Sequence, residues 1–113
     1  TVQAKALPTI SPVDIIAATF PMGSMTGAPK ISAMKIIESL EDTKRGLYSG
    51  AVGYFTPEGN FDFNVVIRSI LYNASKSYIS FSVGSAITSK STPEKEYQEC
   101  LVKAKAMRSV LEN

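Results

Sequence analysis

Two carboxylates and an ammonium group occur at helical spacing near the C-terminal end of the sequence. Glu96, Glu99 and Lys103 follow one another at intervals of three and four residues, and at about 100° per residue these positions share one side of a helix. An apolar stripe beside them consists of Tyr97, Cys100, Ala104 and Met107. Carboxylates in that position can bind Mg²⁺, which takes oxygen ligands and keeps waters for a substrate to displace. A solvated face with an ordinary Glu99–Lys103 ion pair also explains the spacing.

A fourth charged group lies inside an apolar segment. Arg68 is close in sequence to Val65, Val66, Ile67 and Ile70, where an unpaired guanidinium would be costly to bury. The pattern predicts an anionic partner, which is either a bound carboxylate or an internal Asp or Glu.

The segment from Gly23 to Lys30 superficially resembles a phosphate-binding loop. Only three residues separate its two glycines, and Lys30 follows Ala28-Pro29, so the Walker pattern is absent. We interpret the segment as an ordered turn that enters a helix, a position whose free amides attract anions.

The composition limits the catalytic schemes that the chain can use and the partners and compartment that are expected for it. The 113 residues are 44% hydrophobic with a net charge of +2, which predicts one folded domain without a basic surface for nucleic acid. No apolar run approaches the roughly 20 residues that span a bilayer, so no membrane partner is expected. The absence of histidine excludes Ser-His-Asp and Cys-His nucleophilic schemes. The single cysteine, Cys100, is interpreted as a small core residue and favours a reducing compartment, the cytoplasm.

Local patterns predict the elements that must position these groups. Ser11 as N-cap and Pro12 at the first helical position predict a helix that ends near residue 20. A second helix is predicted from Pro29 to Glu41 by apolar residues at helical spacing. A final helix is predicted from Pro93 to the C-terminus, with Ser91 or Thr92 as its cap.

Three strands are predicted between the second and the final helix. They cover residues 47–55, 61–72 and 78–87, with turns at 57–60 and 73–77. The order predicts an α+β domain in which two N-terminal helices and one C-terminal helix pack on an antiparallel three-stranded meander. Apolar residues occur on both faces of the strand over 61–72, which suggests that a further layer covers the second face.

Four ordered blocks give the chain a resemblance to the C-terminal part of the chorismate-utilising enzymes. The blocks are residues 20–30 (FPMGSMTGAPK), 45–54 (RGLYSGAVGY), 62–68 (DFNVVIR) and 93–99 (PEKEYQE), the last followed by Lys103. Within that family, the Ser24 and Thr26 form of the glycine loop is most similar to component I of the aminodeoxychorismate synthases, and the anthranilate synthases are the near alternative.

The resemblance implies a fold and a reaction. Residues 1–113 would be the C-terminal fragment of a chorismate-binding domain, an αββα sandwich whose missing sheet covers the open face. The enzyme would aminate chorismate to 4-amino-4-deoxychorismate, for para-aminobenzoate and folate synthesis, with ammonia from a glutamine amidotransferase subunit. As an isolated fragment the chain is expected to be inactive and to self-associate through its uncovered sheet face. A structural or interaction role for the isolated chain stays open.

The resemblance also implies roles for individual residues. Mg²⁺ would be bound by Glu99 directly and by Glu96 through water. Substrate contacts are implied for Tyr48, Ile67, Arg68, Gly84 and Lys103. Tyr48 and Arg68 would hold the enolpyruvyl carboxylate, and the Gly84 amide would contact a substrate carboxylate. The nucleophile and the general acid are expected upstream, so no catalytic residue is assigned here.

Two positions depart from the pattern of the family. Ala86 stands where a second glycine is common, and Thr88 stands where an acidic residue is usual. These departures put the local geometry in doubt and keep an inactive or repurposed domain among the alternatives.

Overall fold

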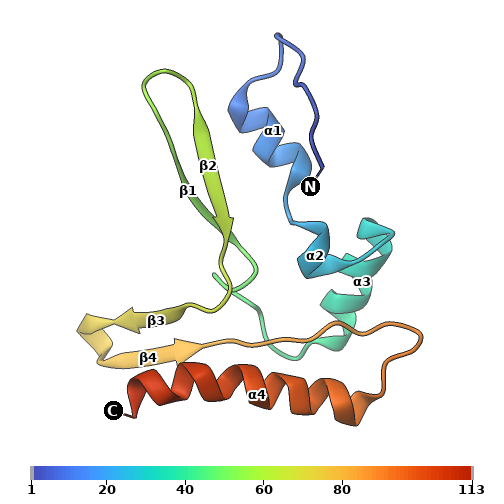
Figure 1. Ribbon diagram of the computed structural model, residues 1–113, viewed down its shortest axis with the longest axis vertical. Helices are drawn as coiled ribbons and strands as arrows, with labels where there is room; N and C mark the ends of the chain where they lie inside the picture. The colour runs from blue at the N-terminus through green and yellow to red at the C-terminus, as the bar shows by residue number, and fades with distance from the viewer. Residues whose placement is uncertain (1, 113) are drawn as a thin grey trace. The chain divides into compact units, whose positions relative to one another are not determined.

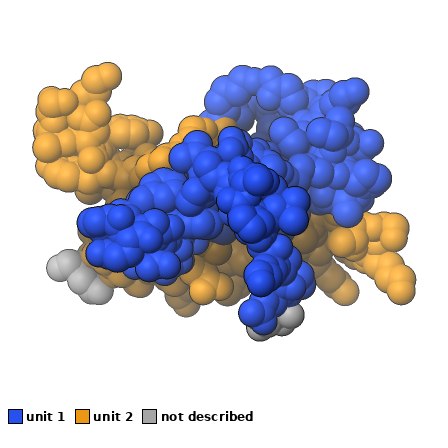
Figure 2. Space-filling model, turned by 90° about the horizontal axis from the view of Figure 1, so that it is seen from above, with its two compact units in different colours: residues 1–44, 49–65 blue, residues 45–48, 66–113 orange. Residues whose placement is uncertain are grey.

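The computed structural model describes residues 2–112 and has the α+β content that the sequence predicts. The chain divides into two compact units. The first unit contains residues 2–44 and 49–65, and the second contains residues 45–48 and 66–112. The two units are coloured separately in Figure 2.

The helices of the first unit begin where local signals place them. In α1 (Pro12–Thr19), the Ser11 hydroxyl accepts a hydrogen bond from the Asp14 amide at 3.2 Å, and the Asp14 carboxylate accepts one from the Ser11 amide at 3.4 Å. These reciprocal bonds satisfy two otherwise free donors. α3 (Lys30–Leu40) agrees with the predicted second helix. The intervening segment, predicted to be a turn, contains one short helix, α2 (Gly23–Thr26).

A hairpin completes the first unit. β1 (Ala51–Phe55) and β2 (Phe61–Val65) are antiparallel, with Gly53 opposite Phe63 (Figure 1). The predicted turn between them is confirmed: Gly59 has φ 86° and its amide donates to the Thr56 carbonyl at 3.0 Å. Glycine suits this position because a side chain disfavours positive φ.

The second unit contains a smaller hairpin and the C-terminal helix. β3 (Ile70–Asn73) and β4 (Tyr78–Phe81) are antiparallel and are joined by the short helix η1 (Ala74–Lys76). The Asn73 side chain accepts a hydrogen bond from the Lys76 amide at 3.1 Å, which closes this connection. After β4 an irregular segment returns to α4 (Pro93–Leu111) (Figure 1).

The predicted three-stranded meander is replaced by two two-stranded sheets, β1–β2 and β3–β4. The predicted strand over 61–72 is interrupted at 66–69, where Arg68 has φ 53°. A strand cannot keep its pleat through a residue in the left-handed region, so pairing stops at Val65 and resumes at Ile70. The predicted strand over 78–87 likewise ends at Phe81.

The C-terminal helix agrees with the prediction in extent but differs in its cap and its face. Thr92 is the N-cap residue, but its side chain makes no capping hydrogen bond. Tyr97, which the sequence places in the apolar stripe, is 63% exposed. The half-buried residues of this face are Glu96, Cys100, Ala104 and Met107. Glu96 therefore occupies the place predicted for an apolar side chain, because it faces the segment that precedes the helix.

Few side chains are fully buried. Among residues 2–112, Val66 is the one buried hydrophobic residue and Ser49 the one buried polar residue. Aromatic rings gather on one face of the β1–β2 hairpin, where the Phe55 ring lies 5.7 Å from Phe61 and 5.3 Å from Phe63. Phe55 is nevertheless 48% exposed. The apolar faces that the sequence predicts are thus present but are not covered by the described residues. No helix within residues 2–112 is both long enough and apolar enough to cross a membrane.

Candidate functional site

All seven residues with predicted site roles lie in the second unit. Five of them, and also Ser85, lie at or next to the place where the first half of α4 contacts the segment that follows β4. We call this place the helix–segment junction. The five are Tyr48, Gly84, Glu96, Glu99 and Lys103. Residues 67 and 68 lie in the bend between β2 and β3. The structure thus brings most of the predicted site together, and no hydrogen bond or ion pair among the described residues joins Arg68 to it.

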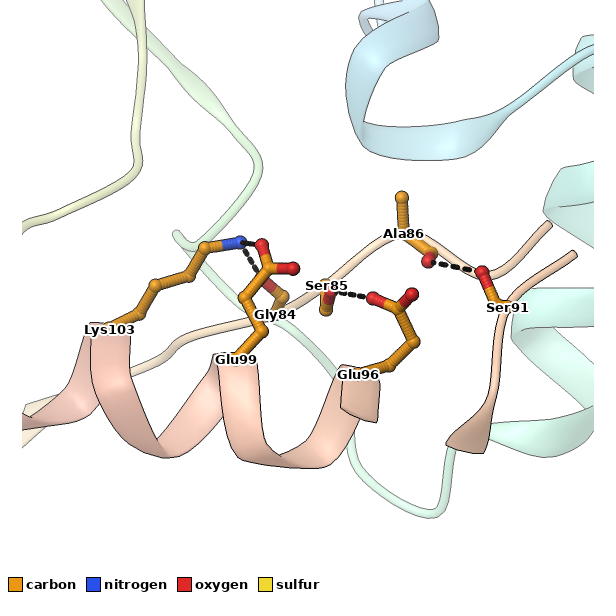
Figure 3. Close-up of polar contacts among 7 residues, drawn as sticks. All are labelled: Gly84, Ser85, Ala86, Ser91, Glu96, Glu99 and Lys103. Atoms are coloured by element: carbon orange, nitrogen blue, oxygen red, sulfur yellow. Dashed lines mark hydrogen bonds and ion pairs between the residues drawn. The ribbon is translucent and has the colours of Figure 1, made fainter. Parts of the chain in front are cut away.

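Lys103 joins the helix to the segment. Its ammonium group lies 2.5 Å from Glu99 Oε1 and donates to the Gly84 carbonyl oxygen at 3.0 Å. Figure 3 shows the ammonium between these two acceptors. Four residues separate Glu99 from Lys103, so the helix itself supports their pairing. The Gly84 contact is a tertiary one, because Gly84 lies 19 residues earlier in the chain.

The charges of this pair affect each other. The Lys103 ammonium holds the pKa of Glu99 below its usual 4.5, chiefly through their hydrogen bond, and the Ser85 hydroxyl makes a smaller contribution in the same direction. Glu99 in turn raises the pKa of Lys103 above its usual 10.5, although partial desolvation of the ammonium opposes this. Both groups are therefore charged around neutral pH.

Glu96 has a partner of its own. The Ser85 hydroxyl donates a short hydrogen bond to Glu96 Oε2 (Figure 3). Glu96 and Ser85 are both half-buried, whereas Glu99 and Lys103 are exposed. The two carboxylates are thus held toward the same segment, Glu96 by a hydroxyl and Glu99 by an ammonium.

Tyr48 approaches the same segment from another part of the unit. A β-carbon built on Gly84 would lie 2.7 Å from the Tyr48 hydroxyl oxygen, which is closer than a β-carbon can tolerate. Glycine is therefore required at position 84 for the tyrosine to lie there. The phenol also contributes to the raised pKa of Lys103, so Tyr48, Gly84 and Lys103 share one neighbourhood.

Arg68 does not lie where the sequence predicts. It was expected within a strand and in need of an anionic partner, but it lies in the bend and its side chain is exposed. Water can therefore solvate the guanidinium, and no hydrogen bond or ion pair joins it to another residue of the described part of the chain. Ile67 beside it is 39% exposed. A φ of 53° costs a non-glycine residue about 1 kcal/mol or more.

The donor set at the helix–segment junction fits Mg²⁺ rather than a metal that needs a complete protein cage. Among residues 2–112, no group of three or more Asp, Glu, Cys or His side chains could hold a metal ion. Two carboxylates one helical turn apart are present in Glu96 and Glu99. Mg²⁺ is commonly bound by one or two carboxylates, and water and substrate oxygens complete its coordination.

The remaining candidates have local roles. The Lys30 ammonium at the start of α3 donates to the Thr19 carbonyl at 2.9 Å, which joins α3 to the end of α1. Cys100 is a free cysteine and is half-buried on α4.

Sequence reasoning missed Ser85, which bonds to Glu96. One signal was available. In the strand predicted over 78–87, the odd-numbered face is otherwise apolar, with Ile79, Phe81, Val83 and Ile87. A single hydroxyl on such a face is a candidate for a specific polar partner.

Residues 1–109 match the family model described as chorismate binding enzyme. The chain is 46% identical over 112 residues to a probable chloroplastic aminodeoxychorismate synthase of Oryza sativa subsp. japonica, covering 99% of this chain and 12% of that protein. It is 46% identical over 100 residues to aminodeoxychorismate synthase component 1 of Bacillus subtilis, covering 88% and 21%. It is 43% identical over 100 residues to anthranilate synthase component 1 of Aquifex aeolicus, covering 88% and 20%. The chain thus spans between about a tenth and about a fifth of the length of these relatives.

Proposed function

Because this chain belongs to the family of chorismate binding enzymes, we propose that it supplies part of the site of a Mg²⁺-dependent enzyme that aminates chorismate to 4-amino-4-deoxychorismate. The ammonia comes from a glutamine amidotransferase partner, and the product serves para-aminobenzoate and folate synthesis. The observation that carries the proposal is the helix–segment junction, where Lys103 joins Glu99 to Gly84 and Ser85 holds Glu96.

Chorismate has two carboxylates, and the chain offers two kinds of group for them. Glu99 directly, and Glu96 through water, would hold Mg²⁺, which would supply positive charge for the ring carboxylate. The Arg68 guanidinium and the Tyr48 hydroxyl are assigned to the enolpyruvyl carboxylate, because a planar guanidinium pairs with a carboxylate through two parallel bonds. The Gly84 amide is a further donor to a substrate carboxylate.

Three features support these assignments. Arg68 is exposed and is not engaged by another described residue, so its fork of donors is available to an anion. Ile67 is partly exposed beside it and can line the pocket. Lys103 places a second positive charge at the junction. The nucleophile and the general acid are assigned to neither the junction nor the bend.

The aminodeoxychorismate branch is preferred over anthranilate synthesis on the form of the glycine loop. Ser24 and Thr26 lie in α2, and the Thr26 hydroxyl donates to the Met22 carbonyl at 3.3 Å. Relatives of both kinds match the chain at similar identity, so the product decides between the branches.

The test uses the full-length protein that contains this sequence, with chorismate, ammonium and Mg²⁺, and identifies the product by mass. Formation of 4-amino-4-deoxychorismate is the expected result. Anthranilate would transfer the protein to the alternative branch. Recovery of unchanged chorismate, with ammonium and also with a glutaminase supplied, would contradict both branches and direct attention to Ala86 and Thr88.

A matched pair of variants tests the metal role. Glu99→Gln is expected to lower Mg²⁺-dependent turnover about 100-fold or more, because it removes the charge of the direct ligand. Glu112→Gln is the control, since Glu112 also forms an ion pair with a residue of α4, with Arg108 at 2.9 Å, but lies away from the junction. Equal turnover in the two variants would remove the metal role of Glu99.

A second candidate is a non-catalytic module, which one observation favours. Glu96 and Glu99 already have partners within the chain, as structural carboxylates would. Such a module would interact through exposed apolar faces such as that of Phe55 and Phe61. Calorimetric binding of chorismate and Mg²⁺ by the 113-residue chain would exclude a purely structural role.

A further inference from the structure

The segment that follows β4 contacts α4 at two points, Lys103 and Glu96, which are seven residues or about two helical turns apart. The Gly84 carbonyl accepts a hydrogen bond from Lys103, and the adjacent Ser85 hydroxyl donates one to Glu96. The first contact uses the backbone carbonyl of Gly84 rather than a side chain of the segment. The second depends entirely on the side chain at position 85.

Ser85 lies between the two carboxylates of the proposed metal site. Its hydroxyl bonds to Glu96 Oε2 and also interacts with Glu99. Two carboxylates three residues apart on a helix repel each other, and each long side chain samples several rotamers when it is free. A hydroxyl donor between them restrains Glu96 and offsets part of the repulsion.

The backbone at Ser85 is itself held in place. Ser91, in the loop that leads to α4, donates to the Ala86 carbonyl at 3.3 Å (Figure 3). The Ser91 hydroxyl also accepts a hydrogen bond from the Thr88 amide at 3.0 Å. These bonds close the loop between Ser85 and the helix start. The backbone next to Ser85 is therefore held by hydrogen bonds at the point where the Ser85 hydroxyl donates to Glu96.

From these contacts we propose that Ser85 is a positioning residue, whose hydroxyl holds the Glu96 carboxylate beside Glu99 so that both are arranged for a divalent cation before it arrives. The inference rests on the proposed function of the site. It adds a residue that neither the family pattern nor the helical spacing singles out. Groups that orient metal-binding carboxylates typically change metal affinity by about 10-fold to 100-fold.

The test measures Mg²⁺ binding directly by calorimetry in the full-length protein, together with the Mg²⁺ dependence of turnover. Ser85→Ala is expected to weaken Mg²⁺ binding about 10-fold, with turnover at saturating Mg²⁺ close to that of the wild type. Ser85→Thr keeps a hydroxyl and is expected to restore most of the affinity. Ser89→Ala is the control, because Ser89 is exposed in the same segment and makes no side-chain hydrogen bond within residues 2–112.

A double variant isolates the route through Glu96. In a Glu96→Ala background, Ser85→Ala is expected to change Mg²⁺ affinity much less than in the wild type, since its hydrogen-bond partner is gone and only the smaller interaction with Glu99 remains. Independent effects of the two substitutions would overturn the inference, as would wild-type affinity in Ser85→Ala.

The failure of the inference is distinguishable from that of the proposed function. If Glu99→Gln weakens Mg²⁺ binding while Ser85→Ala does not, only the role of Ser85 is overturned. If the wild-type protein binds no Mg²⁺, both are overturned.

Discussion

Two ion pairs on α4 have the same spacing but different surroundings. Glu99 and Lys103 lie 2.5 Å apart, and Arg108 and Glu112 lie 2.9 Å apart, each pair four residues apart on the helix. The Arg108 pair is the more exposed and has its charges in the order that the helix dipole disfavours. The Lys103 pair has the favoured order and a third partner, the Gly84 carbonyl.

The difference shows what distinguishes a surface ion pair from a candidate site. Helical spacing alone produces both pairs, and exposed pairs of this kind contribute little to stability. Within residues 2–112, only the Glu99–Lys103 pair is contacted by a segment distant in sequence, and that segment also supplies Ser85 to Glu96. Contact with a second element of the chain is therefore the feature that distinguishes the candidate site from an ordinary surface ion pair.

The largest effect is expected from a change at Gly84, in the segment that contacts the Glu99–Lys103 pair. In Gly84→Ala, the added methyl group would lie within 2.7 Å of the Tyr48 hydroxyl oxygen, so the tyrosine or the segment must move. We expect kcat/KM for chorismate to fall about 100-fold in the full-length protein. Gly23→Ala is the control, because its added methyl meets nothing within 4 Å. Equal kinetics for the two variants would show that the close approach has no role.

An intermediate effect is expected when the cation of the Glu99–Lys103 pair is removed, and no effect is expected when that of the Arg108–Glu112 pair is removed. Lys103→Gln loses a charged donor to both Glu99 and the Gly84 carbonyl, and we expect the affinity for chorismate to fall about 10-fold. Arg108→Gln removes the cation of the other pair and should leave the affinity unchanged. Substrate titration of both variants checks this, and a similar loss in both would place the effect in the helix rather than in the site.

The smallest expected effect is on the pH dependence of stability. The pKa of Glu99 is lowered from 4.5, so its stabilising contribution is present above pH 4.5 and is lost as the pH falls through the lowered pKa. The pKa of Lys103 is raised from 10.5, so its contribution is present below pH 10.5 and is lost as the pH rises through the raised pKa.

Urea unfolding of the wild type and Lys103→Gln across pH checks this window. The two midpoints are expected to differ slightly between these pH limits and to converge in strong acid and strong base, because the pair is largely exposed to solvent. A difference that stays constant across the whole range would contradict the assignment to this pair.

The helices were predictable because their signals are local. The Ser11 cap, Pro12 and Pro93 fix where α1 and α4 begin, and each acts on residues of its own first turn. The turn before β2 was predictable for the same reason, since Gly59 supplies the positive φ that this turn needs.

The break at Arg68 was not predictable from the sequence. Residues 65–72 around it contain no glycine, proline or asparagine, and their apolar residues are those of a strand. The left-handed conformation of Arg68 goes against its own preference, so the surrounding structure must impose it. This break divided the expected meander into two hairpins.

The sequence by itself determined which residues share a helix face, where most elements begin and which family pattern the chain carries. Capping, turns and helical spacing act between residues within about five positions of one another, and the blocks of the pattern are read directly from residue order. Only the tertiary structure decided that Lys103 reaches the Gly84 carbonyl and that Ser85 reaches Glu96. These contacts join residues 19 and 11 positions apart, and whether they meet depends on the path of the chain between them.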